Sequence, residues 1–270
     1  MTRVLSGAVL IALAIGVVWF APPLIFWAVA ELLLFLAFIE YARLSAAVGL
    51  PTPLIPAGVA TVLASVGVTS THWIGTELVG TAVALDAVLM SAFVALAATT
   101  LTTWRGDRDA LARAAAAVFP MLYLGLPIGA MVALRARHGR EALFLLLLTV
   151  IVSDTAQYYS GRAFGRRLLA PAISPKKTVE GAIGGFIFGA LLLMIVGAWW
   201  APTLPIALRA ALGVALVALG IAGDLFESML KRSANVKDSS TLIPGHGGIL
   251  DRIDALLFAA PVYYIVLKYV

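Results

Sequence analysis

The amino-acid sequence predicts an all-α fold, a polytopic transmembrane helix bundle of about nine spans. Hydrophobic residues make up 62% of the 270 residues and charged residues only 12%, whereas a soluble domain is nearer ~45–50% apolar and ~25% charged. The mean hydropathy of +1.02 reflects apolar runs of about 18 residues or more, each long enough to cross a bilayer as a helix. The chain contains no cysteine, which excludes disulfides and thiol chemistry.

Hydropathy divides the chain into nine predicted spans separated by short polar segments, one of them a break at 43–45. The first apolar run leads straight into the second, so we expect a membrane span there and not a cleaved signal peptide. No Gly/Ser-rich or Pro-rich linker interrupts the sequence, which predicts a single integral-membrane domain over residues 1–270. The predicted spans cover residues 4–20, 24–41, 54–68, 78–99, 114–134, 142–159, 181–200, 206–229 and 249–267.

The distribution of basic residues predicts a cytoplasmic N-terminus. With this orientation fourteen of the nineteen Lys and Arg residues fall in cytoplasmic segments, as the positive-inside rule requires. The predicted loop that carries Arg135, Arg137, His138 and Arg140 is an exception on the outer side. Because the rule accounts for the net charge of +5, we expect no nucleic-acid partner.

Residues 224–254 form the most distinctive polar stretch of this apolar chain. They include five of the fourteen acidic residues and four of the nineteen basic ones, although ionisable groups are costly near a bilayer. Asp224, Glu227, Ser228 and Lys231 follow each other at i, i+3, i+4 and i+7, so on a helix they share one face.

Asp251 and Asp254 share a face at the head of the last span, and the helical hairpin brings them toward Asp224. Three carboxylates in one place favour a Mg²⁺ site completed by phosphate and water, since without a cation they would repel each other. In the structural alternative, Asp251 caps the last helix and Asp254 pairs with Arg252 or Lys231.

The loop between these carboxylates contains the groups that bind phosphates. Lys and Arg bind phosphate as a point charge and as a fork, and glycines let backbone N–H groups approach an anion closely. His246 has an alternative role as a turn residue that is hydrogen-bonded to backbone. The loop residues are Lys231, Arg232, Lys237, Asp238 and the turn Pro244-Gly245-His246-Gly247-Gly248.

A second polar segment, 153–185, lies on the same predicted cytoplasmic face. Asp154 stands at the end of an apolar span, where a carboxylate is costly unless it is paired, and Arg162 follows. We expect Ser174 to Thr178 to form a Pro-rigidified turn with two cations before the next helix, a plausible triphosphate cradle. Alternatively, the arginines snorkel to the membrane surface and Glu180 is a helix-cap partner of Lys177. Glu31 and Asp86, inside apolar spans, receive no role.

These motifs resemble the phosphatidate cytidylyltransferase (CDP-diacylglycerol synthase) family. The signature S-x-L-K-R-x4-K-D-x-S-x2-I-P-x-H-G-G-I-x-D-R-I-D runs from Ser228 to Asp254. Gly223-Asp224 and the segment GRAFGRR…ISPKKTVEG are similar too, so the likeness covers the C-terminal half from about Ser153. One departure is Gln157, which stands where the family usually has Ala.

The resemblance implies that CTP and phosphatidic acid react to give CDP-diacylglycerol and pyrophosphate with Mg²⁺. It also implies a homodimer, possible use of K⁺ as a second cation, and the bacterial inner membrane with a cytoplasmic active site. The catalytic half is then 151–270, after the hydrophobic spans of 1–150. The dianionic phosphate of phosphatidate needs charge neutralisation and in-line alignment, and no general base.

Together, residue chemistry and resemblance define the candidate site. The metal ligands are Asp224, Asp251 and Asp254. The catalytic set is Asp224, Lys231, Arg232, Lys237, Asp238, His246, Asp251 and Asp254. The substrate-binding set is Asp154, Arg162, Ser174, Lys176, Lys177, Glu180, Glu227, Ser228, Gly247, Gly248 and Arg252.

Two other functions are possible for a chain of this kind. A transporter or flippase would bury polar groups in several spans and show an internal repeat, whereas the polar clusters here lie at helix ends on one side. A CTP-dependent lipid kinase is a closer rival, and it would transfer the γ-phosphate and release CDP.

Overall fold

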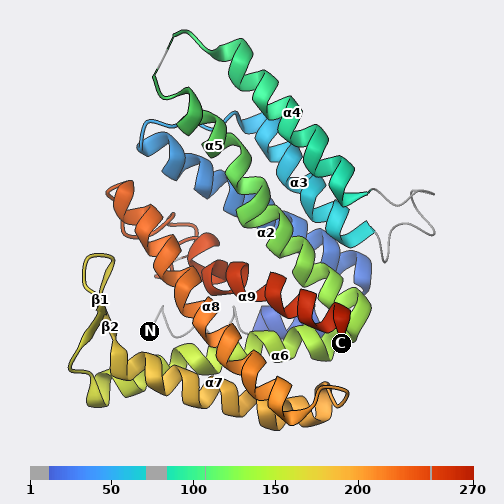
Figure 1. Ribbon diagram of the computed structural model, residues 1–270, viewed down its shortest axis with the longest axis vertical. Coiled ribbons are helices and arrows are strands. Elements are labelled where there is room, and N and C mark those ends of the chain that lie inside the picture. The colour runs from blue at the N-terminus through green and yellow to red at the C-terminus, as the bar shows by residue number, and fades with distance from the viewer. Residues whose placement is uncertain (1–11, 71–83, 107, 244) are drawn as a thin grey trace.

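The computed structural model describes residues 12–70, 84–106, 108–243 and 245–270, and they are mostly helical (Figure 1). A predicted all-α fold is therefore confirmed apart from one short hairpin. The elements are α2 (Pro23–Ala47), α3 (Leu54–Ser70), α4 (Leu85–Thr103), α5 (Ala110–Pro120), the π-helix η1 (Met121–Gly125), α6 (Leu126–Phe164), β1 (Leu168–Ala170), β2 (Ser174–Thr178), α7 (Val179–Trp200), α8 (Ile206–Ser233) and α9 (Leu250–Tyr269).

Among the described residues, five helical stretches are long and apolar enough to cross a membrane. They are Pro23–Ala47, Leu85–Thr103, Ala110–Phe164, Val179–Trp200 and Ile206–Ser233. The protein is thus an integral membrane protein, while the count of nine spans and the orientation stay predictions. The start of the predicted first span and the start of the fourth, residues 4–11 and 78–83, lie outside the described residues.

The predicted break at 43–45 is wrong, because α2 continues to Ala47. Both Ser45 and Leu44 are buried there, and the Ser45 hydroxyl donates to the carbonyl of Leu50, which follows the helix. A polar side chain that finds a backbone acceptor does not have to end a helix.

A loop is predicted at 135–140, but the structure has a helix there that is interrupted at one residue. The helix α6 runs through the whole segment except at Gly139, whose φ of 84° and ψ of 170° are non-helical. Glycine has no Cβ and adopts this left-handed region easily. The chain therefore turns sharply inside α6, and the predicted fifth and sixth spans lie on either side of Gly139.

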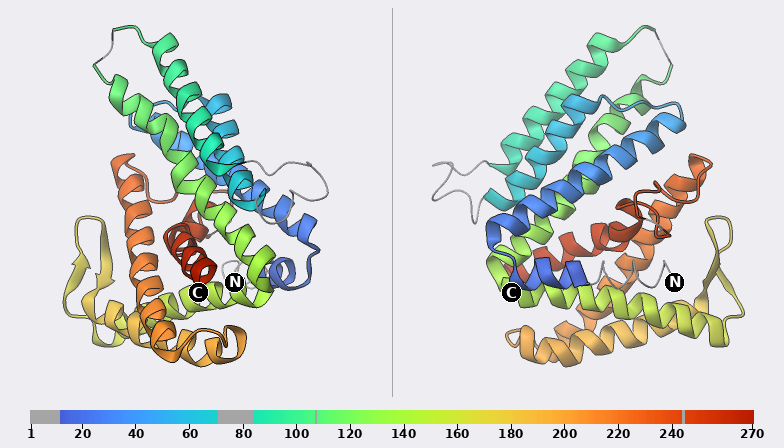
Figure 2. Two further views of the ribbon diagram at one scale, coloured as in Figure 1. Left: turned by 45° about the vertical axis from the view of Figure 1, so that its right-hand side comes forward. Right: turned by 180° about the vertical axis from the view of Figure 1, so that it is seen from behind.

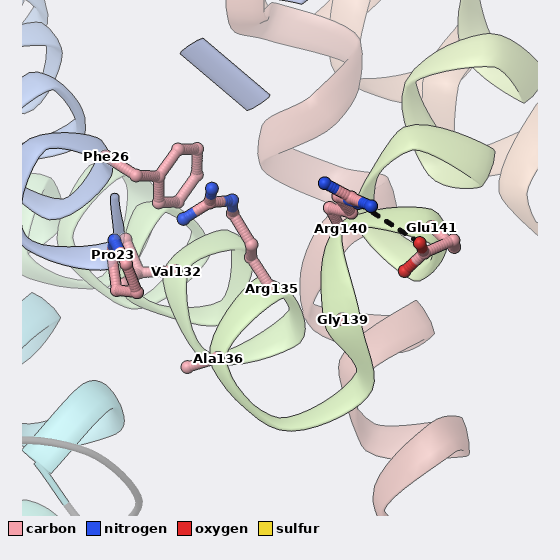
Figure 3. Close-up of a pocket in the computed structure, with 8 residues that line it drawn as sticks. All are labelled: Pro23, Phe26, Val132, Arg135, Ala136, Gly139, Arg140 and Glu141. Carbon is pink, nitrogen blue, oxygen red and sulfur yellow. Dashed lines mark hydrogen bonds and ion pairs between the residues drawn. The ribbon is translucent and has the colours of Figure 1, made fainter. Parts of the chain in front are cut away.

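The arginines beside this break bind the end of the helical segment 12–20, which precedes α2. Arg135 Nε donates to the carbonyl of Val18 at 2.9 Å, and its guanidinium lies over the ring of Phe26. Arg140 donates to the carbonyl of Trp19 at 3.2 Å. A cavity of about 350 Å³ next to them (Figure 3) is lined by Pro23, Phe26, Val132, Arg135, Ala136, Gly139, Arg140 and Glu141.

The helices form two groups that α6 and α9 connect (Figures 1 and 2). α2 to α5 pack on one side, α7 and α8 on the other, and α9 runs through the interior. Leu257, Ala260 and Tyr263 of α9 are at most 2% exposed. The N-terminal and C-terminal halves thus share one core, while the single domain stays a prediction.

An aromatic cluster joins the halves close to the charged stretch. Tyr123 of η1 stacks on Phe119 at a centroid distance of 5.0 Å and meets Phe226 of α8 edge-on at 5.4 Å. Phe258 of α9 contacts the rings of Tyr123 and Phe226. Tyr123 lies in a π-helical turn, and such turns are frequent at functional sites.

The segment from Ser174 to Thr178, predicted as a turn, is the strand β2. It pairs antiparallel with β1, with Leu168 opposite Thr178 and Ala170 opposite Ser174. Pro175 is compatible with this short hairpin because proline is tolerated on edge strands. Thr178 ends the strand and caps α7 by accepting the N–H of Gly181 at 3.1 Å, so the hairpin sits directly against that helix.

Candidate active site

The acidic residues of α8 and α9 come together because these helices touch through a glycine. A Cβ on Gly223 would lie 2.5 Å from the backbone oxygen of Asp254 and 3.2 Å from the Cα of Ala255. The absence of a side chain therefore allows the backbones to approach closely. Asp224, the next residue, is consequently near Asp254.

Lys177 connects the two polar segments that the sequence analysis singled out. Its Nζ lies 2.6 Å from Oδ2 of Asp224, and the two side chains are 21% and 32% exposed. Ser228, one turn further along α8, donates to the other oxygen of Asp224 at 3.4 Å. The strand β2 and the helix α8 therefore form two sides of one partly open, charged site.

A third carboxylate, that of Asp154, lies on the α6 side of the site. Asp154 and Asp254 both interact electrostatically with Asp224, and Lys177 interacts with Asp154 as well. Gln157 Nε2 donates to Asp154 at 2.9 Å and to Ser153 at 3.2 Å. Gln157, the departure from the family pattern, thus holds Asp154 in place.

Beneath this open part lies a buried ion cluster. Lys231 is 8% exposed, and its Nζ lies 2.5 Å both from Glu227 Oε2 and from Asp251 Oδ1. Glu227 is fully buried. A buried charge is stable only when it is paired, so Lys231 holds α8 and α9 together rather than facing the open site.

Asp251 binds the loop that precedes α9. Its Oδ2 accepts the backbone N–H of Ser239 at 2.9 Å and that of Gly248 at 2.8 Å. The Ser239 hydroxyl lies 2.8 Å from the same oxygen. Asp251 is therefore occupied by Lys231 and the loop. Asp254, among the described residues, accepts a hydrogen bond from the N–H of the adjacent Ala255.

The remaining predicted residues lie further out. Arg232 donates to the carbonyls of Ile173 and Val236, each at 3.4 Å. His246 donates its backbone N–H to Ile243 at 2.9 Å, as the turn alternative requires. The exposed members of the predicted set are Asp154, Arg162, Lys176, Arg232, Lys237, Asp238 and Arg252, and Ser174 and Gly247 are half-buried.

The alternative in which Glu180 pairs with Lys177 is not what the structure shows. The Oε2 of Glu180 accepts the backbone N–H groups of Arg166 at 2.9 Å and Arg167 at 3.2 Å, while Lys177 pairs with Asp224. The difference follows from β2, which places Lys177 within reach of Asp224 on α8. Glu180 therefore stabilises the chain where it leaves α6.

The donor chemistry of the open site fits a divalent cation only in part. Asp154, Asp224 and Asp254 provide hard carboxylate oxygens, which Mg²⁺ prefers, and the Lys177 ammonium already neutralises one of them. In the part of the chain that the structure describes, no three Asp, Glu or His side chains form a ready metal-binding group. An ion here would need further ligands from substrate phosphates or water.

Two residues of the N-terminal half near the site were missed from the sequence. Glu40 of α2 is buried and hydrogen-bonds to Ser239 and Leu250. Tyr123 interacts electrostatically with Glu227 and Asp254. The only sequence signal for Glu40 is an acidic residue at the end of an apolar span, and Tyr123 has none.

The fold and this site define a class: an integral membrane protein with acidic and basic side chains gathered where its helices end. The chain belongs to the cytidylyltransferase family, whose model matches residues 1–270.

Curated relatives match part of the chain. It is 48% identical over 130 residues to the phosphatidate cytidylyltransferase of Haemophilus influenzae, covering 47% of this chain and 45% of the relative. It is 42% identical over 127 residues to that of Aquifex aeolicus, 46% of each chain, and 36% identical over 148 residues to that of Bacillus subtilis, 54% and 55%. The matched part thus spans about half the length of these relatives.

Proposed function

We propose that this protein is a phosphatidate cytidylyltransferase, which transfers CMP from CTP to phosphatidic acid and releases pyrophosphate. The observation that carries the proposal is the pairing of Lys177 with Asp224. It joins two motifs, almost fifty residues apart, into one site of carboxylates and cations at the helix ends. The family membership and the names of the relatives support the same reaction.

The chemistry requires little covalent help from the protein. A phosphate oxygen of phosphatidate attacks the α-phosphorus of CTP, the bond to the β-phosphate oxygen breaks, and pyrophosphate leaves. Because phosphatidate is largely dianionic at neutral pH, the main tasks are alignment and charge neutralisation. Lys177 is placed to bind a phosphate oxygen, and the exposed Lys176 and Arg162 lie on the same segment.

We propose Mg²⁺ as the cofactor, held by Asp224 and Asp254 together with substrate phosphates. When bound, Mg²⁺ neutralises phosphate charge and orients the triphosphate. Asp251 joins this set only if it exchanges its contact with Lys231. The family resemblance also supports K⁺ as a second cation, a homodimer, and a bacterial inner membrane location with the site facing the cytoplasm.

Labelled CTP tests the reaction. Purified protein is given phosphatidate vesicles and CTP labelled at either the α- or the γ-phosphorus. We expect α-label in the lipid and γ-label in pyrophosphate, and the Asp224→Asn variant should transfer neither while remaining folded. Transfer of the γ-label to lipid would instead identify a lipid kinase, and full transfer by Asp224→Asn would contradict the role of this carboxylate.

A further inference from the structure

Glu40 caps a helix that is distant in the sequence. It lies in α2 and is only 3% exposed, yet its oxygens accept the backbone N–H groups of Ile249 at 3.0 Å and Leu250 at 2.8 Å. These are the first donors of α9, which have no partner within the helix. A carboxylate at this point also interacts favourably with the helix dipole.

Glu40 also binds both serines of the loop before α9. Ser240 Oγ donates to Oε1 at 2.7 Å, and Ser239 Oγ lies 2.9 Å from Oε2. The same Ser239 hydroxyl is 2.8 Å from Asp251, and with one proton it donates to one carboxylate at a time. The Ser239 hydroxyl therefore lies between the carboxylates of Glu40 and Asp251, within hydrogen-bond distance of both.

Gly248 shows how closely this arrangement is packed. A Cβ on this residue would overlap both carboxylate oxygens of Glu40 and the hydroxyl of Ser239. The backbone of the glycine turn thus rests directly on Glu40, and its N–H goes to Asp251. The absence of a side chain at Gly248 therefore leaves room for the Glu40 carboxylate and the Ser239 hydroxyl.

We propose that Glu40 is a positioning residue of the active site: it fixes Ser239 and the first turn of α9, and through them Asp251 and Asp254. The inference rests on the proposed function. Among the described residues, the four hydrogen bonds that Glu40 accepts all come from the segment that carries those carboxylates. By comparison Glu31, two and a half turns earlier in α2, accepts one hydrogen bond within the described part of the chain, from Ser65 of α3.

The Glu40→Gln variant tests the role in turnover. An amide nitrogen cannot accept hydrogen bonds, so either the pair Ile249 and Ser240 or the pair Leu250 and Ser239 loses its acceptor. Outer-shell partners of this kind typically contribute 10- to 100-fold. We expect kcat for CDP-diacylglycerol formation to fall by about that factor, with KM for CTP changed less than about threefold. The matched control Glu31→Gln should stay within about twofold of the parent.

A double-mutant cycle tests the route through Ser239. Ser239→Ala should lower kcat, and adding it to Glu40→Gln should cost less than the two separate losses predict, because both break the same link. Ser240→Ala removes a contact of Glu40 but none of Asp251, so its effect should be smaller than that of Ser239→Ala. If the losses of kcat from Glu40→Gln and Ser239→Ala were strictly additive in free energy, the proposed route would be overturned.

A spin label measures the mobility of the loop before α9 independently of the reaction. The chain has no cysteine, so Leu242→Cys, 53% exposed, can carry a nitroxide at a single position. We expect Glu40→Gln, but not Glu31→Gln, to make the label more mobile. Unchanged mobility, or unchanged kcat in a folded Glu40→Gln, would overturn the proposal. If the parent protein makes no CDP-diacylglycerol, the proposed function fails, while label mobility still tests the anchor.

Discussion

Lys231 is the residue that balances the buried charges between α8 and α9. Its ammonium contacts Glu227 and Asp251, each at 2.5 Å, inside a region that solvent barely reaches. Removal of one partner from a buried ion cluster leaves uncompensated charge in a medium of low dielectric constant. The sequence predicts that Lys231 binds phosphate. In the structure its ammonium pairs with two buried carboxylates, a contact that stabilises the fold.

Replacement of Lys231 by methionine should therefore destabilise the fold strongly. We expect the free energy of unfolding in detergent micelles to fall by about 3–5 kcal/mol. The comparison variant is Lys177→Met, in the partly exposed pair with Asp224, which should cost no more than about 1 kcal/mol. Losses of equal size would show that the Lys231 cluster is not the buried element described above.

At the scale of elements, the α8–α9 contact sets the distance between the two acidic helix faces. Gly223 allows this contact, because any side chain there would meet the backbone of Asp254 and Ala255. Backbone atoms cannot move aside as a flexible side chain can. The helices would have to separate, and Asp254 would move away from Asp224.

Gly223→Ala and Gly220→Ala form a matched pair one helical turn apart. The added Cβ at Gly220 would meet only Ala255 Cβ at 3.7 Å, an ordinary contact, so this variant should be neutral or up to about 1 kcal/mol more stable. Gly223→Ala should lose about 1–3 kcal/mol and most of its turnover. Equal behaviour of the two variants, measured by unfolding and label transfer, would contradict the close helix contact.

For the whole molecule, the structure separates two polar ends. The loop with Ser239 and the hairpin lie near the candidate site, whereas Arg135 and Arg140 bind backbone beside the break inside α6. This arrangement explains how basic residues can lie on the predicted outer side: they are used to hold the chain, and they stack on Phe26 and Trp19.

Single cysteines test which end faces the cytoplasm. Leu242→Cys lies in the loop before α9, and Thr203→Cys lies in the exposed connection between α7 and α8. With a membrane-impermeant maleimide, intact cells should label only Thr203→Cys, and inverted vesicles should label only Leu242→Cys. The opposite pattern would reverse the orientation, and labelling of both from one side would contradict a spanning α8.

The sequence by itself determined the helical membrane class, because composition and the length of apolar runs decide whether a segment lies in lipid or in water. It also determined which residues of α8 share a face, since helical periodicity is local. The signature between Ser228 and Asp254 was long enough to place the chain in its family.

Only the tertiary structure decided which polar and charged residues pair with each other. Glu40 and Ser239 are 199 residues apart, and no periodicity links them. The same holds for Lys177 and Asp224, which meet because Ser174–Thr178 forms a strand. A buried charge takes the partner that packing brings within reach. That is why the sequence could locate the charged groups, while the folded chain alone determined that Lys231 binds α9 and that α2 holds the site in place.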